Sequence, residues 1–158
     1  IKIFKRNFLV HNISELFIYG GLAALFVEVL SVFTVSLLII LISIYDMYAV
    51  WKSKHMIKLA KFQSKLNIFS GFLIPYQERK KQKAAILGGG DIGFPLLFAG
   101  VVLLEQGIFA LIIPFTVGTS LLLLLIYGKK NKYYPAMPYL GAGCFTGLLI
   151  VKLIPFLF

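Results

Sequence analysis

Two long apolar runs, residues 16–51 and 84–127, and a shorter one near the C-terminus cover most of the chain. The first run is interrupted at Glu28, and the second at Glu105 and the two residues after it. A bilayer core needs about 20 apolar residues per helix, so each long run is better explained by two helices than by one. The pattern therefore predicts five membrane spans, over residues 8–27, 29–51, 85–105, 108–127 and 135–156.

Basic residues lie almost entirely between these spans. Of the 16 lysines and arginines, all but Lys152 precede the first span, lie between the second and third, or lie between the fourth and fifth. With five spans, these segments all fall on one side of the membrane, and the positive-inside rule makes that side cytoplasmic. Lys152 lies near the far end of the last span, where its side chain can reach the interface. We therefore expect the N-terminus and the basic loops to be cytoplasmic.

Composition supports a membrane protein. Hydrophobic residues make up 59% of the chain and charged residues 14%, against about a quarter charged in soluble domains. We expect an all-α polytopic bundle, with residues 1–158 forming one membrane-embedded region. The net charge of +10 is explained by cytoplasmic loops, so we expect a lipid bilayer and no nucleic acid as partner. A single cysteine, Cys144, excludes an intrachain disulfide and is expected to pack in the core.

Residues 52–84 form the longest basic segment, which we expect to be a cytoplasmic loop. Its first part, residues 52–66, predicts an amphipathic helix lying on the membrane surface. The apolar stretch Ile68–Tyr76 is too short to span, and could lie on the membrane or in a groove of the protein. The lysines at helical spacing are Lys54, Lys58, Lys61 and Lys65, beside the apolar Leu59, Phe62, Leu66 and Phe69.

Both aspartates of the chain, Asp46 and Asp91, lie inside predicted spans, where a charge is costly and usually marks function. Asp46 lies six residues before Lys52, roughly 9 Å from the cytoplasmic boundary, and Asp91 eight residues after Lys83, roughly 12 Å from the same side. Taken singly, Asp46 could reach the interface and Asp91 could cap a helix. Their matched depth on antiparallel helices favours a common role.

Two neighbouring carboxylates suit peptide hydrolysis by water. Close carboxylates do not both ionise easily and share a proton, so one accepts a proton from water while the other hydrogen-bonds the substrate carbonyl. This chemistry needs no serine or cysteine nucleophile, no metal and no cofactor. Gly88, Gly89 and Gly90 precede Asp91 and allow close backbone approach. Pro135-Ala136-Met137-Pro138 begins the last span, either as irregular backbone beside a cavity or as a helix start with proline in its first turn.

Three motifs resemble those of presenilins and signal peptide peptidases, which are intramembrane aspartyl proteases of the GxGD type. Tyr45-Asp46 resembles their YD motif, and Gly88, Gly90 and Asp91 resemble their GxGD motif. Pro135-Ala136-Met137 is similar to their PAL motif, with Met137 replacing leucine. The following Pro138 is similar to presenilins, and Ser53-Lys54-His55-Met56-Ile57 is similar to archaeal members, for which a cell-membrane location is expected.

The resemblance implies that the five spans correspond to helices five to nine of a nine-helix protease. The four preceding helices would then be partners from the same protein, since the chain begins at Ile1 and shows no signal peptide. It also implies substrates that are single transmembrane helices, cut within the membrane.

Other classes stay open from the residues alone. A proton-coupled transporter or channel could use both aspartates as a proton relay, an inactive scaffold could tolerate their loss, and a prepilin-type peptidase shares the GxGD motif.

Overall fold

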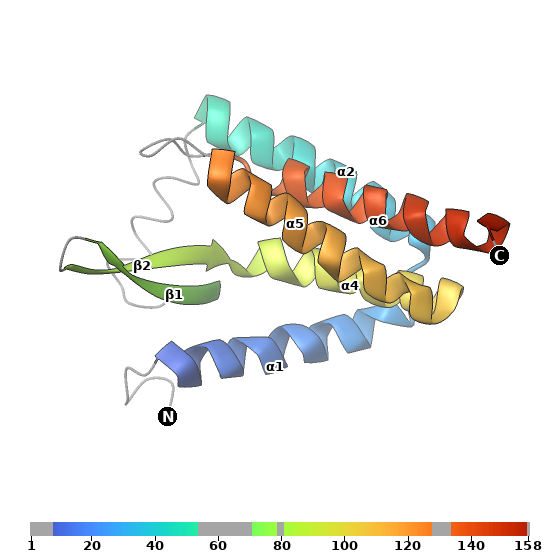
Figure 1. The fold of residues 1–158 in the computed structure, drawn as a ribbon, viewed down its shortest axis with the longest axis horizontal. Helices are drawn as coiled ribbons and strands as arrows, with labels where there is room; N and C mark the ends of the chain where they lie inside the picture. Colours follow the sequence, from blue (N-terminus) through green and yellow to red (C-terminus); the bar gives the residue numbers. More distant parts are fainter. Residues whose placement is uncertain (1–7, 54–70, 79–80, 128–133, 158) are drawn as a thin grey trace.

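The computed structural model describes residues 8–53, 71–78, 81–127 and 134–157. Within these ranges five α-helices run in alternating directions, and a β-hairpin lies at the end of the bundle where α1 begins (Figure 1). The fold is thus an all-α bundle with one added hairpin. The elements are α1 (Phe8–Val27), α2 (Val32–Tyr48), β1 (Gly71–Glu78), β2 (Lys81–Gly88), α4 (Gly89–Gln106), α5 (Ile112–Tyr127) and α6 (Met137–Leu157).

The first long apolar run turns near Glu28, as predicted, and α2 begins at Val32. Ser31 is the N-cap of α2, and its hydroxyl accepts a hydrogen bond from the Thr34 amide. The amide of Val32 donates to a carboxylate oxygen of Glu105 at 2.9 Å. Because the first amides of a helix have no partner within it, Glu105 satisfies one of them and joins the end of α4 to the start of α2.

The second long run bends at Gly107. This residue has φ of 73°, in the left-handed region that glycine adopts without strain. A 3₁₀ turn, Gly107–Leu111, follows and leads into α5. By length and composition, four stretches of the described residues could cross a membrane. The longest, the 39 residues Gly89–Tyr127, contains both α4 and α5.

The hairpin was not predicted. Its strands pair antiparallel from Gly71 with Gly88 to Glu78 with Lys81. The third span was expected to begin as helix at residue 85, but residues 85–88 belong to β2 and α4 begins at Gly89. A short apolar run does not distinguish strand from helix by composition, so the start of this run was assigned to the wrong element. The predicted surface helix over 52–66 lies outside the described residues from position 54 onward, and residues 49–53 form a π-helical turn.

α4 lies at the centre and contacts α1, α2, α5 and α6. Phe98 on α4 is fully buried and meets Phe145 of α6 edge-to-face, with ring centroids 5.9 Å apart. Cys144 is fully buried in the same core, as predicted. Many large apolar side chains on the outer faces are exposed, for example Phe17, Phe33 and Leu125. An apolar surface of this extent is typical of a bundle whose solvent is lipid.

Glycines bring helices close together where side chains would separate them. A Cβ on Gly147 of α6 would lie 3.0 Å from the Cα of Ile113 on α5, and one on Gly143 would lie 2.9 Å from the Cα of Val117. The Thr116 hydroxyl on α5 donates to the carbonyl of Gly143 at 2.8 Å. Small residues of this kind allow helices to pack by van der Waals contact in lipid, where apolar burial alone drives little association.

Candidate active site

Three helix ends meet where the sequence motifs lie. The C-terminal end of α2 and the N-terminal ends of α4 and α6 are at the same end of the bundle (Figure 1). Asp46 is in the last turn of α2, Asp91 is in the first turn of α4, and Met137 is the first residue of α6. The fold therefore gathers segments that are far apart in the sequence.

Asp46 contacts the start of α6 directly. Its side chain is only 5% exposed, and its Oδ2 accepts a hydrogen bond from the backbone amide of Met137 at 3.0 Å. The amide of Ala136 also interacts with this carboxylate. The first amides of a helix lack intrahelical partners and attract anions, so the carboxylate completes the hydrogen bonding of α6. The YD and PAL-like motifs are thus in contact, although Tyr45 itself is 64% exposed.

The proline-containing segment makes an ordered helix start. Ala136 precedes the helix, and its carbonyl accepts hydrogen bonds from the amides of Tyr139 and Leu140. Pro138 lies in the first turn, where its missing amide proton costs no hydrogen bond. Pro135 and Met137 are buried. Both sequence interpretations hold in part, since α6 begins with proline in its first turn and residues 134–136 before it are irregular.

Asp91 folds back on the glycine segment. The N-cap of α4 is Gly88, so Asp91 is three residues into the helix rather than its cap. Its carboxylate accepts a hydrogen bond from the Gly88 amide, which is the geometry of a capping box. A Cβ on Gly88 would lie 3.1 Å from Oδ2 of Asp91, so this glycine leaves room for the carboxylate. Asp91 is partly exposed.

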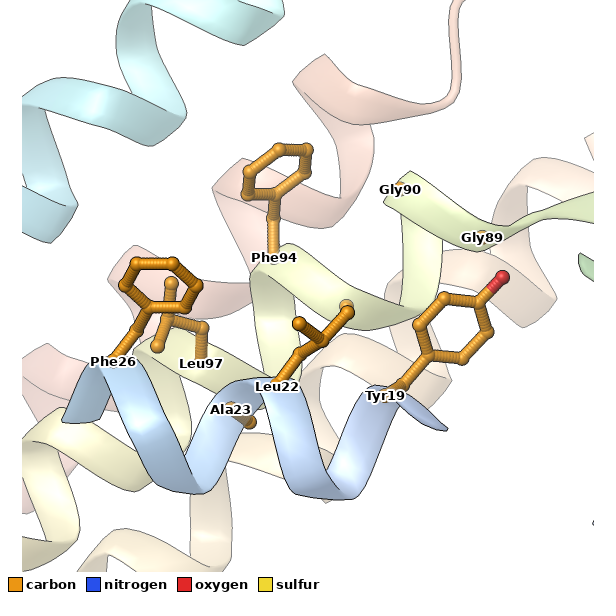
Figure 2. A pocket seen from close by; sticks show the side chains of 9 residues that line it. Tyr19, Leu22, Ala23, Phe26, Gly89, Gly90, Phe94 and Leu97 are labelled. Atoms are coloured by element: carbon orange, nitrogen blue, oxygen red, sulfur yellow. The ribbon is translucent and has the colours of Figure 1, made fainter. Parts of the chain in front are cut away.

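An apolar cavity of about 380 Å³ lies between α1 and α4, next to the glycine segment (Figure 2). A Cβ on Gly90 would meet the Phe94 ring at an ordinary 3.4 Å, whereas one on Gly89 would collide with Tyr19. The cavity is lined by Tyr19, Leu22, Ala23, Phe26, Gly89, Gly90, Gly93, Phe94 and Leu97.

The sequence interpretation missed Glu15 and Tyr19 on α1. Glu15 is 2% exposed and Tyr19 8% exposed, on a helix whose side chains are mostly exposed. An acidic residue inside a predicted span is itself a signal of function, and Glu15 could have been found by that rule. Within the described ranges, no three His, Cys, Asp or Glu residues are grouped so that they could hold a metal ion.

The bundle and its two aspartates define a multi-pass membrane protein with carboxylates held at helix ends. The family model described as signal-peptide peptidase, presenilin aspartyl protease matches residues 1–156. The chain belongs to this family of intramembrane aspartyl proteases. No curated protein matches the chain, so its closer resemblance to archaeal members stays a prediction.

Proposed function

We propose that Asp46 and Asp91 form the catalytic pair of a protease that hydrolyses peptide bonds within transmembrane helices. The observation that carries this proposal is that the fold brings Asp46, in the last turn of α2, and Asp91, in the first turn of α4, to the same end of the bundle (Figure 1), and that α2 and α4 contact each other. Membership of an aspartyl protease family supports it independently. One carboxylate accepts a proton from water, the other hydrogen-bonds the scissile carbonyl, and water attacks the carbonyl carbon.

The glycine and proline segments serve this reaction by shaping the backbone around the pair. Gly88 leaves space for the Asp91 carboxylate. The Met137 amide fixes the Asp46 carboxylate. The irregular backbone of residues 134–136 is a place where a locally unwound substrate can pair as an added strand. We expect the N-terminus and the basic loops to face the cytoplasm, and further helices of the same protein to complete the substrate path.

The test is cleavage of a transmembrane peptide by purified protein, with products identified by mass spectrometry. Asp46→Asn and Asp91→Asn should each abolish cleavage, and the double variant should be no worse than either, because residues that act as one unit are not additive. Activity of the wild type should depend on pH in a bell-shaped manner, as an acid and base in one pair require.

A transporter or channel would instead give ion flux in proteoliposomes with no peptide product. Near wild-type cleavage by a well-folded Asp46→Asn or Asp91→Asn protein would refute the proposed pair. Folding of each variant is checked by thermal unfolding in the same detergent.

A further inference from the structure

Three polar side chains on α1 recur every four residues and therefore share one face of the helix. They are His11, Glu15 and Tyr19, here called the polar ridge. Glu15 and Tyr19 are buried, and His11 is partly buried, whereas Phe17 beside them is 76% exposed. The mechanism proposed above uses none of these three, although the ridge faces the segment that carries Asp91.

The N-terminal end of the polar ridge contacts the hairpin. A ring nitrogen of His11, Nε2, lies 2.8 Å from the carbonyl oxygen of Gly71 and is hydrogen-bonded to it. Gly71 pairs with Gly88 in the hairpin, and Gly88 is the N-cap of α4 whose amide bonds Asp91. The hydrogen bond from His11 therefore holds the hairpin at the point where the chain enters the catalytic helix.

The C-terminal end of the polar ridge contacts the first turn of α4. Figure 2 shows the Tyr19 side chain rising from α1 with its hydroxyl toward Gly89. A Cβ on Gly89 would lie 2.6 Å from Cζ of Tyr19 and closer still to its hydroxyl, while one on Gly93 would lie at an ordinary 3.7 Å from the ring. The ring is packed directly on the backbone between the N-cap and Asp91.

Glu15 lies between these two contacts by helical spacing. A buried carboxylate in a membrane helix is costly, and such residues are usually partnered and functional. Among the described residues, no buried side-chain nitrogen or oxygen lacks a hydrogen-bond partner. The carboxylate is thus held within the protein rather than exposed to lipid.

We propose that the polar ridge positions Asp91 from outside the catalytic pair. Tyr19 fixes the first turn of α4 by packing on Gly89, and His11 fixes the hairpin that leads into it. Glu15 stabilises the face between them. All three are positioning residues, and the inference rests on the proposed role of Asp91 in catalysis.

The principal experiment is a pair of compensating substitutions at positions 19 and 89, made in the full-length protein. Gly89→Ala should lower kcat about tenfold or more with little change in KM, because a displacement of about 1 Å at a reacting group can cost up to about a hundredfold. Tyr19→Leu alone should lower kcat, because the ring no longer holds the first turn of α4. It also makes room for the added methyl group, so it should reduce the loss of kcat caused by Gly89→Ala. Tyr19→Phe should not reduce this loss of kcat, because its Cζ atom would still lie 2.6 Å from the added methyl group.

Gly21→Ala is the matched control, because its Cβ would face open space and its kcat should match the wild type. An unchanged kcat in Gly89→Ala, or an equal loss whatever the residue at position 19, would overturn the inference, since coupling between the two positions is what packing requires.

A second measurement addresses Glu15. Glu15→Gln keeps the shape and hydrogen-bonding atoms and should retain more kcat than Glu15→Leu, at a similar thermal midpoint. Equal kcat in Glu15→Gln and Glu15→Leu would show that Glu15 does not help to position Asp91. Loss of cleavage in Asp46→Asn and Asp91→Asn, together with normal kcat in every ridge variant, would leave the protease assignment standing and refute only the positioning role.

Discussion

Replacing Asp46 by alanine or by asparagine separates its structural role from its chemical one. The carboxylate is 5% exposed and accepts the Met137 amide at 3.0 Å. Asparagine keeps an oxygen that can accept this hydrogen bond, whereas alanine removes it and leaves the first amide of α6 without a partner.

The size of the effect follows from that one bond. An unpaired buried donor costs about 1–3 kcal/mol. A charge-assisted hydrogen bond is roughly twice as strong as a neutral one, so the asparagine variant should lose about 1 kcal/mol. We therefore expect Asp46→Ala to be less stable than Asp46→Asn by about 1 kcal/mol, with cleavage absent from both.

The assay is thermal or denaturant unfolding of wild type and both variants in one detergent, beside the cleavage assay. Ser36→Ala is a suitable control on the same helix, because its hydroxyl donates to the Val32 carbonyl of its own helix. Equal stability of Asp46→Ala and Asp46→Asn would show that the hydrogen bond from the Met137 amide to position 46 does not stabilise the start of α6, which would refute this prediction.

Three further predictions concern the glycines and the topology. Gly88→Ala should lower kcat about tenfold with little change in thermal midpoint, because its Cβ would lie 3.1 Å from Oδ2 of Asp91. Gly147→Ala should destabilise the protein by about 1–3 kcal/mol, because its Cβ would lie 3.0 Å from the α5 backbone, whereas Gly118→Ala faces open space and should not. Single cysteines placed in residues 52–83 should react only from the cytoplasmic side, and labelling from outside intact cells would contradict the five-span arrangement.

The helices could be predicted from the sequence because lipid demands long apolar runs. Their turns near Glu28 and Gly107 could also be predicted, since polar residues and glycine interrupt those runs. The hairpin could not, because Ala84–Leu87 are as apolar as the helix that follows, and only pairing with β1 makes them a strand.

Asp46 and Asp91 were predicted from their position inside apolar spans, and both lie within the residues 1–156 that the family model matches. Their roles in catalysis stay a proposal. Contacts between helices could not be predicted from the sequence. The spacing of residues along the chain does not indicate that Asp46 accepts a hydrogen bond from the Met137 amide, or that Tyr19 packs on Gly89. Such contacts depend on how the helices pack, which periodicity within one helix does not determine.

Because Asp46 and Met137 lie far apart in the sequence, their hydrogen bond can form only late in the synthesis of the chain. Asp46 emerges from the ribosome long before residue 137, and its carboxylate finds that amide only after α6 has inserted. An incomplete chain therefore contains both aspartates without the arrangement seen in the folded bundle. The Asp46 carboxylate therefore takes up its place against Met137 only when α6, the last helix of this region, has docked.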